Sequence, residues 1–537
     1  MILSEQSGRK VKTILYVRLP CWKIYPGGVI YVADFIHKQH PEIKQELLDL
    51  AIVPKGERKQ VLKARILALD PDMVAFSWRN MQSFGPHPED DALDVVMKFD
   101  YSPNLWHRLK AAVDAVSIIY EYTASRFRNF AFMRLVRKLK PESKIIVGGT
   151  AVSIFGKYVI KHCPVNTVVV VGEGEPTMLS IINGESSTIG ECYCKNSAGE
   201  IAYSNRTDNF NLSKLTAVNF EYIESIFPEI HEYTDDYIGV HTKRGCPYQC
   251  HFCLYNKIEG HNQRYRDPVE IVDEIETLNK RYGVRNIWFT DAQFCSTRRS
   301  THHVEEILDE IIRRKLKIQW TGYLRLNYLT LELAGKMLDS GLASLDLSFT
   351  GTQEVINSLT LGYSLEQQME AFQMFKDAGY TNQKVKLYIP LNAPGETPLT
   401  LRKTIDRIKD LYQIFGRDNV LPFIFFIGIQ PGTPVEKLLI KQGYLGKNYN
   451  PLTFNPFVIK KLLYNPKPLG KIIARSYLEA VAAHDKDSEY IGRTTMDIIE
   501  RKLAGGVGGK TPPFDKDPAE KQPSQTRLQA EPPRVSN

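Results

Sequence analysis

Three cysteines, Cys246, Cys250 and Cys253, stand close together near the middle of the chain. Their spacing is CxxxCxxC, and an aromatic residue, Phe252, precedes the last of them. Three thiolates can bind three irons of a [4Fe–4S] cube and leave the fourth iron without a protein ligand. A small molecule that carries an amine beside a carboxylate can chelate that open iron. The spacing therefore predicts an iron–sulfur site that performs chemistry rather than one that only carries electrons.

The same three cysteines could instead hold a structural zinc ion. Structural zinc sites use four ligands, and His251 could supply a fourth only from inside the loop, where the geometry is poor. No second CxxC pair stands nearby. We therefore favour the iron–sulfur cluster over zinc.

The elements around the cysteines indicate how they are held. Between about residues 237 and 444, strand patterns alternate with helix patterns, and the cysteines directly follow the first strand, 237–242. Asp267-Pro268 has the composition of a helix start. About six such units predict a partial (β/α)6 barrel, whose active site lies at the carboxyl ends of its strands.

The first part of the chain alternates in the same way. Strand patterns occupy residues 12–20, 46–53, 73–78, 144–152 and 167–171, with helix patterns between them, the longest at 109–139. This α/β pattern predicts a doubly wound parallel sheet of the Rossmann-like kind over residues 1–186. An acidic stretch at 81–107 is expected to be an irregular insertion, of the kind that forms lids or binding loops.

The rest of the chain divides by composition. We expect residues 187–231 to be a linker with a small hairpin at 191–204, and residues 232–450 to form the barrel domain. Residues 451–503 read as helical and basic, and residues 504–537 have the composition of a disordered tail. The basic residues at 460, 461, 467, 471 and 475 favour either an anionic or lipid-like substrate, peripheral contact with a membrane surface, or simply a solvated helix face.

Bulk composition excludes several classes of protein. The net charge of +8 is spread over 537 residues and forms no basic stripe of the kind that binds nucleic acid. No apolar run approaches the roughly 20 residues of a transmembrane helix, and the first 12 residues have no signal-peptide pattern. The five other cysteines have no regular spacing, so we expect no disulfide framework and a reducing, cytoplasmic compartment.

Further motifs recur in a fixed order along the chain, and together with the cysteine run they resemble the cobalamin-binding-domain radical SAM enzymes from Lys12 to about Gly443. The motifs are Gly148-Gly149-Thr150 after a strand, Gly172-Glu173-Gly174-Glu175, the run from Phe289 to Phe294, Trp320 followed by Arg325, Pro394-Gly395-Glu396-Thr397, and Gln430-Pro431-Gly432-Thr433-Pro434.

The resemblance implies three cofactors: a [4Fe–4S] cluster, S-adenosylmethionine (SAM) and cobalamin. The residues that it places near cobalamin are Gly148, Gly149, Thr150, Gly172, Glu173 and Gly174. Those that it places near SAM are Phe252, Asp291, Arg325, Ser348 and Thr350. Where many relatives carry a glutamate on the next strand, this chain carries Phe349, which puts one usual SAM contact in doubt.

Structural roles stay open for several of these residues. The glycines could merely make tight turns, Asp291 could cap a helix, and Arg325 could form a surface ion pair. No D-x-H-x-x-G motif supplies a cobalt-binding histidine, since neither His37 nor His162 has that context, so the lower axial ligand is left open. Cys295 could face the cavity or be a buried free thiol.

The activity implied by the resemblance is reductive cleavage of SAM, used for cobalamin-dependent methylation of an unactivated carbon. One alternative is a radical ring closure, like that of the anaerobic oxidative cyclase of bacteriochlorophyll synthesis, which would act on a tetrapyrrole. Another is a non-catalytic cobalamin or redox sensor. We expect a small-molecule substrate of unknown identity and a reducing partner such as flavodoxin or ferredoxin.

Overall fold

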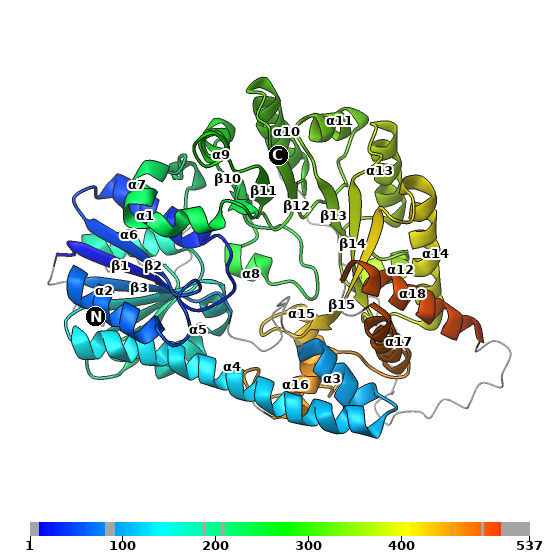
Figure 1. Ribbon diagram of the computed structural model, residues 1–537, viewed down its shortest axis with the longest axis horizontal. Helices are drawn as coiled ribbons and strands as arrows, with labels where there is room; N and C mark the ends of the chain where they lie inside the picture. Colours follow the sequence, from blue (N-terminus) through cyan, green and yellow to red (C-terminus); the bar gives the residue numbers. More distant parts are fainter. Residues whose placement is uncertain are drawn as a thin grey trace.

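A computed structural model describes residues 10–80, 92–185, 190–205, 210–453, 455–484 and 488–505. It consists of an N-terminal α/β sheet, a barrel-like β/α half and a set of C-terminal helices, arranged around a central opening in the ribbon (Figure 1). Residues 81–91 of the acidic insertion and residues 506–537 of the tail lie outside the described part of the chain.

The N-terminal sheet has the strand order β2-β1-β3-β4-β5-β6-β7, and its first five strands run parallel. Order 2-1-3-4-5 is one of the two common doubly wound arrangements, and such sheets bind ligands beyond the carboxyl ends of their strands. The strands are β1 (Thr13–Arg18), β2 (Lys44–Asp49), β3 (Met73–Ser77), β4 (Lys144–Gly148) and β5 (Thr167–Val170). The expected fold of this half is confirmed.

Helices cover both faces of this sheet because its strands are apolar on both sides; in β1, for example, Leu15 and Val17 belong to one apolar cluster, and Ile14 and Tyr16 to the other. The covering helices are α1 (Gly27–Gln39), α2 (Arg58–Leu69), α4 (Leu105–Leu139), α5 (Thr150–His162) and α6 (Gly174–Asn183).

The expected hairpin forms, but it extends the N-terminal sheet instead of lying in a separate linker. Its strands are β6 (Cys192–Lys195) and β7 (Ile201–Ser204), and β6 pairs antiparallel with β5. Helix α7 (Phe220–Ile226) then packs against α1 and β2 before the chain enters the second half.

The acidic insertion differs from our expectation because its described part is helical. Helix α3 (Ala92–Tyr101) packs on α4, which begins at Leu105, and on α17. The basic C-terminal residues take part in this packing: Lys460 forms an ion pair with Asp100 at 2.8 Å, and Arg475 donates a hydrogen bond to the carbonyl of Tyr101. Two of the five basic residues therefore have structural partners on α3.

The second half contains six parallel strands in the order β8-β11-β12-β13-β14-β15. Two runs of paired strands are joined by isolated parallel bridges between Trp320 and Leu342 and between Tyr323 and Asp346. The strands form an open barrel. They are β8 (Ile238–Val240), β11 (Asn286–Phe289), β12 (Gln319–Gly322), β13 (Ser344–Ser348), β14 (Lys384–Leu391) and β15 (Val420–Gly428).

Helices alternate with these strands and cover the outside of the barrel (Figure 1). They are α9 (Pro268–Tyr282), α10 (Arg298–Arg313), α11 (Leu331–Asp339), α12 (Gln353–Ser358), α13 (Leu365–Asp377), α14 (Pro398–Phe415) and α15 (Pro434–Lys441). The predicted start of α9 is confirmed, since the Asp267 side chain accepts hydrogen bonds from the amides of Val269 and Glu270.

The C-terminal region is helical, as expected. Helices α17 (Leu469–His484) and α18 (Ser488–Gly505) pack on each other, and α18 also packs on β15. Between the barrel and these helices lie α16 (Pro456–Leu462) and the short strand β16 (Leu463–Tyr464), which pairs with β15. In the described residues, no helix is both long enough and apolar enough to cross a membrane.

Candidate functional site

The cysteine loop follows the first barrel strand and the two-residue strand β9 (Lys243–Arg244), which pairs with β10 (Arg264–Tyr265). It ends in the short helix α8 (Tyr255–Glu259). Gly245 opens the loop with a φ of 95°, and a Cβ there would collide with the carbonyl oxygen of Asn262. Only glycine allows the chain to turn so close to that backbone, and this turn places Cys246 at the strand end.

Burial raises the pKa of all three cysteines above the ordinary value, and it brings that of Cys253 to about 11. Arg325 opposes this effect at Cys250 by charge and by a hydrogen bond that lower the pKa of the thiol. A cationic iron centre would stabilise the thiolates far more strongly, so the loading of iron must release protons.

The donor set of this loop fits a cluster with three protein ligands. Among the described residues, no group of three or more histidine, cysteine, aspartate or glutamate side chains is placed to hold one metal ion. Each thiolate of a [4Fe–4S] cluster binds a different iron, so its three ligands need not converge on one point.

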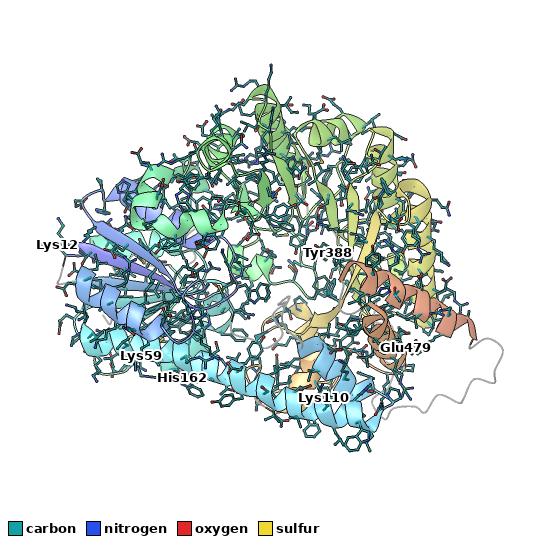
Figure 2. The ribbon with its side chains drawn as sticks, in the orientation of Figure 1. Lys12, Lys59, Lys110, His162, Tyr388 and Glu479 are labelled. Atoms are coloured by element: carbon teal, nitrogen blue, oxygen red, sulfur yellow. The ribbon has the colours of Figure 1, made fainter. Side chains whose placement is uncertain are left out.

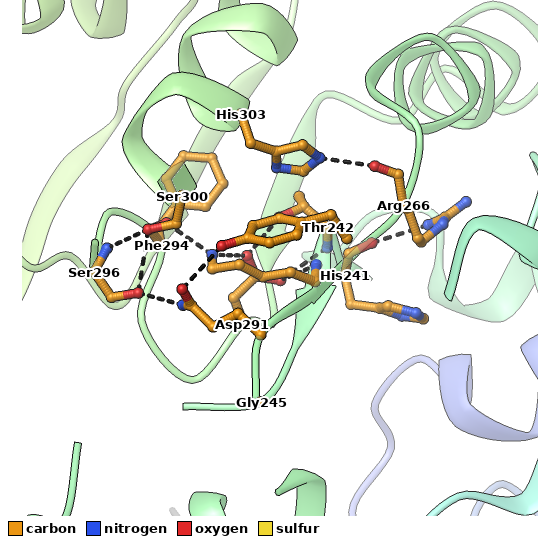
Figure 3. Close-up of polar contacts among 12 residues, drawn as sticks. His241, Thr242, Gly245, Arg266, Asp291, Phe294, Ser296, Ser300 and His303 are labelled. Carbon is orange, nitrogen blue, oxygen red and sulfur yellow. Dashed lines mark hydrogen bonds and ion pairs between the residues drawn. The ribbon is translucent and has the colours of Figure 1, made fainter. Parts of the chain in front are cut away.

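A buried network anchors the base of the loop to the barrel (Figure 3). Asp291, which is 1% exposed, accepts hydrogen bonds from the amide of Thr242 at 2.8 Å and from its hydroxyl at 2.5 Å. It also forms an ion pair with the ammonium of Lys243 at 2.6 Å, and that ammonium donates to the carbonyl of Phe294 at 2.7 Å. Because both oxygens of its carboxylate bind Thr242 or Lys243, Asp291 holds the base of the loop in place. The predicted contact of Asp291 with SAM stays a prediction.

Arg325 lies beside the cysteines instead of on the surface. Its guanidinium stacks on the ring of Tyr248, 3.7 Å from the ring centre, and one of its nitrogens donates to the carbonyl of Leu361. The Nε atom of Arg325 is buried and has no hydrogen-bond partner within the protein. It is therefore a buried donor still available to a ligand near Cys250.

The other residues predicted near SAM separate into two kinds. The hydroxyls of Ser348 and Thr350 are buried and have no hydrogen-bond partner, so both are available to a ligand. Phe252 lines the large cavity described below and packs edge-on against Phe425. Phe349, in contrast, is fully buried in the core against Phe372 and cannot replace the glutamate of the relatives.

At the carboxyl edge of the N-terminal sheet, the predicted glycines line a cavity of about 230 Å³. Gly149 has a φ of 101°, and a Cβ there would lie 2.7 Å from the carbonyl oxygen of Trp78. Gly172 has a φ of 84°, and its amide donates to the hydroxyl of Ser153 at 3.0 Å. The cavity contains Gly148, Gly149, Thr150, Gly172, Glu173 and Gly174 in its lining, so all six residues predicted near cobalamin come together.

A larger cavity of about 1190 Å³ joins the two halves of the molecule. Its lining includes Thr150 and Ala151 from the sheet edge and Phe252, Cys253 and Tyr255 from the cysteine loop. It shares Thr150, Arg244 and Glu259, among others, with the smaller cavity, so the two spaces adjoin. Aromatic side chains are frequent in its wall, and they include Trp22, Tyr25, Tyr31, Trp78, Tyr122, Phe155, Tyr237, Trp288 and Tyr323.

An ionic cluster crosses from one half to the other at the edge of both cavities. Arg244 forms ion pairs with Glu173 at 2.9 Å and with Glu175 at 2.7 Å. Arg264 adds a second ion pair to Glu173 at 2.6 Å. Burial alone would raise the pKa of Glu175, but Arg244 outweighs it and holds the pKa below its usual value. We call Arg244, Arg264, Glu173 and Glu175 the interdomain clamp.

Sequence reasoning did not find the clamp, and it also missed polar groups inside the barrel. Asp346 on β13 is fully buried and accepts hydrogen bonds from Thr321 at 2.7 Å and from the hydroxyl of Tyr388 at 3.0 Å. Tyr388, near the centre of Figure 2, stacks with Phe423 and meets Tyr323 edge-on. The sequence signal is weak, because Asp346 falls on the same alternate polar positions of the strand as Ser344 and Ser348.

Of the remaining cysteines, Cys21 lines the larger cavity, whereas Cys295, Cys192 and Cys194 line neither cavity. All eight cysteines are free. Cys295 is buried and is not part of either cavity wall, and burial raises its pKa to about 12. Cys192 and Cys194 lie in the paired strand β6.

Comparison with known proteins agrees with this geometry. Residues 240–408 match the family described as the radical SAM superfamily. An uncharacterized methyltransferase of Pyrococcus horikoshii is 21% identical over 372 residues, which span 66% of this chain and 76% of that protein. The anaerobic magnesium-protoporphyrin IX monomethyl ester cyclase of Rubrivivax gelatinosus is 24% identical over 294 residues, 52% of this chain and about half, 51%, of the cyclase.

Among solved structures, the radical SAM methyltransferase TsrM of Kitasatospora setae, with cobalamin and a [4Fe–4S] cluster bound, superposes with a TM-score of 0.61 at 16% identity. The match covers 92% of this chain and 99% of TsrM. At this identity the likeness establishes the fold, and it extends over both halves of the molecule.

Proposed function

We propose that the chain is a radical SAM enzyme of the group with a cobalamin-binding domain, and that it acts as a cobalamin-dependent methyltransferase. The observation that carries this proposal is the shared cavity. Cys253 of the cluster loop and Thr150 of the glycine-lined sheet edge face the same space of about 1190 Å³. A substrate between them can reach both cofactors at once.

The residues of this chain fit the three groups. Cys246, Cys250 and Cys253 would hold the cluster, while Arg325, Ser348 and Thr350 carry the buried polar atoms that would bind SAM. The cavity lined by Gly148, Gly149 and Gly172 to Gly174 would receive part of cobalamin. When bound, the cluster supplies the electron that cleaves SAM, and methylated cobalamin supplies the methyl group.

The protein then contributes position and exclusion of water. The Asp291 network fixes the cysteine loop, and the clamp fixes that loop relative to the sheet edge. Aromatic side chains surround the space between the cofactor sites. They favour a substrate with a flat apolar surface, which is held by stacking and by area rather than by many hydrogen bonds.

Arginines accompany these aromatic side chains in the cavity wall. Arg58, Arg79 and Arg126 line the cavity together with Arg244, and Glu259 is the one acidic residue among the wall residues described. An excess of positive charge favours an anionic group, such as a carboxylate or phosphate, on the substrate or on cobalamin.

The test is anaerobic loading with iron, sulfide and cobalamin, followed by reduction in the presence of SAM that is labelled on its methyl group. We expect bound cobalamin, cleavage of SAM and label in the product of an aromatic, anionic substrate. Cys250→Ala should abolish cleavage and the cluster absorption, whereas the control Cys295→Ala should keep both. Cobalamin binding with no reductive SAM cleavage by the wild type would support a sensor instead.

The cyclase-like alternative has one specific observation in its favour, which is the similarity to the magnesium-protoporphyrin ester cyclase. A tetrapyrrole would also satisfy the flat apolar requirement of the cavity wall. The same labelled-SAM experiment separates the two, because ring closure consumes SAM and transfers no label to the product.

We further propose a reducing compartment, the cytoplasm, and an electron donor such as flavodoxin or ferredoxin. The proposal is supported by eight free cysteines and by the sensitivity to oxygen that an open iron brings. Reduction of the loaded protein by flavodoxin, measured by the loss of cluster absorption, tests it.

A further inference from the structure

Helix α4 carries a continuous apolar stripe on its outer side. In Figure 1 it runs along the lower edge of the molecule, with no helix or strand beyond it. Seven large apolar residues of its N-terminal part are between 51% and 78% exposed, namely Leu105, Trp106, Leu109, Val113, Val116, Tyr120 and Phe127. The largest exposed apolar patch on a monomer is typically a few hundred Å², so a stripe of this size calls for an occupant.

The spacing of the stripe is that of a helix–helix seam. From Trp106 the positions are 106, 109, 113, 116, 120, 123 and 127, with steps of three and four residues in strict alternation. Position 123 is Thr123, and the other six are apolar. A repeat of 3.5 residues keeps one face turned toward a partner helix along its whole length, whereas the ideal α-helix repeats every 3.6 residues.

The opposite side of α4 already has partners inside the molecule. Ala111 is buried, and α3 packs along this part of the helix. Farther along, Tyr122, Arg126 and Asn129 reach the large cavity. The side of α4 that faces the rest of the molecule is therefore a different side from the stripe, and it already has its packing partners.

We propose that a second copy of this chain covers the stripe, with the two α4 helices packed against each other in a symmetric dimer. A seam of this kind can pair with itself, and most homodimers are closed by a two-fold axis. The seven side chains expose on the order of 1,000 Å² per copy, which matches the roughly 800 Å² per partner that a stable interface buries.

The charges beside the stripe favour a protein partner over a lipid surface. Arg108, Lys110 and Arg128 lie next to it together with Asp114 and Glu121, so basic and acidic side chains are both present. A helix that lies on a membrane is rich in lysine and arginine along its polar face. In an antiparallel pair with the axis near Val116, Lys110 of one copy lies about level with Glu121 of the other, which also pairs with Lys55 and Arg128 of its own chain, so Lys110 would join an existing ion-pair network.

The experiment is sedimentation of the full-length, cofactor-loaded chain at micromolar concentrations under anaerobic conditions. We expect a mass of twice the 61.3 kDa of one chain. The double variant Val113→Glu, Val116→Glu should raise the dimer dissociation constant by at least about 100-fold, because it places like charges in an apolar seam. The control Val269→Glu changes a valine that is 51% exposed on α9 and should leave the dimer intact.

A milder pair of variants tests the charges and does not risk the fold. Lys110→Glu should weaken the dimer several-fold, whereas Lys59→Glu, on α2, should not; both lysines are labelled in Figure 2. A wild-type chain that sediments as a monomer overturns the proposal. Binding of that monomer to vesicles of anionic phospholipid, lost in the double valine variant, would assign the stripe to a membrane surface instead.

Discussion

Lys243 and Arg244 are neighbours in the two-residue strand β9, yet their side chains go to opposite halves of the molecule. Successive residues of a strand point to opposite sides. Lys243 meets Asp291 inside the barrel, and the two side chains are 2% and 0% exposed. Arg244 meets Glu173 and Glu175 of the N-terminal domain, where its own side chain is 14% exposed.

The Lys243–Asp291 pair and the clamp therefore have different structural roles. The Lys243–Asp291 pair is closed within one domain and shielded from water, so its loss leaves an uncompensated buried charge. In the clamp, Arg244 lines both cavities and pairs with Glu173 and Glu175 of the other domain, which line the smaller one. We therefore expect its loss to change how the two cofactor sites face each other. We infer that the first pair maintains the cluster loop, and that the second couples the cluster to the sheet edge.

The strongest test of this comparison is Asp291→Asn. The variant leaves the Lys243 ammonium buried without its counter-charge and should cost about 3 kcal/mol of stability. The loop should then lose its register, and we expect iron content and SAM cleavage to fall together by more than 10-fold. Iron analysis and thermal unfolding measure these effects.

The control removes both charges. Asp291→Asn combined with Lys243→Met should regain most of the lost stability, because no isolated charge remains. Full retention of iron by the single Asp291→Asn variant would show that the loop does not depend on this network.

Breaking the clamp should have a smaller and more selective effect. In Glu175→Gln, Arg244 keeps Glu173, and the cluster loop keeps Asp291. We expect normal iron content and SAM cleavage, with methyl transfer per SAM cleaved lowered about 5- to 20-fold because the cofactor sites shift relative to each other. The ratio of methylated product to methionine released measures this coupling.

The exposed Glu142→Gln on the N-terminal half is a matched control and should leave the ratio unchanged. The variant Arg244→Lys tests the geometry of the contact, since lysine keeps the positive charge but cannot form the bidentate contact with Glu175. Equal loss of SAM cleavage and methyl transfer in Glu175→Gln would mean that the clamp only stabilises the loop.

The sequence predicts the parts of this arrangement that depend on local spacing. The cysteine triplet, the glycines at the sheet edge and the alternation of strands and helices each leave a pattern within a few residues. In the structure, Cys253 and the glycines line two adjoining cavities. The sequence could not predict that Glu173 pairs with Arg244, because 71 residues and a domain boundary separate them.

The structure differs from one expectation and adds a partner to the residue of another. Helix α3 was expected to be irregular because its pattern is short and follows an acidic, proline-containing stretch, and its apolar face is explained by its packing on α4 and α17. For Asp291 the sequence predicts a SAM contact because it follows a strand end, where ligands bind, and the structure adds an ion pair with Lys243 at 2.6 Å. In both cases tertiary packing decided what local sequence left open.

The smallest predicted effect concerns an acid without a cationic partner, as a contrast to the clamp. Burial raises the pKa of Glu396 to about 7, although the amides of Asn392 and Ala393 oppose it. The folded protein therefore binds this proton more tightly than the unfolded chain, and stability falls as pH rises from about 4.5 to 7. Glu396→Gln should remove this loss and be more stable than the wild type by on the order of 1 kcal/mol above pH 7, with no difference near pH 4.

Glu175 behaves oppositely, because its lowered pKa gives stability above pH 4.5 that is lost in acid. The measurement is thermal unfolding of the wild type and of each glutamine variant across this pH range, which gives the stability difference as a function of pH for each site. If the two differences change with pH in the same direction, the distinction between paired and unpaired acids is refuted.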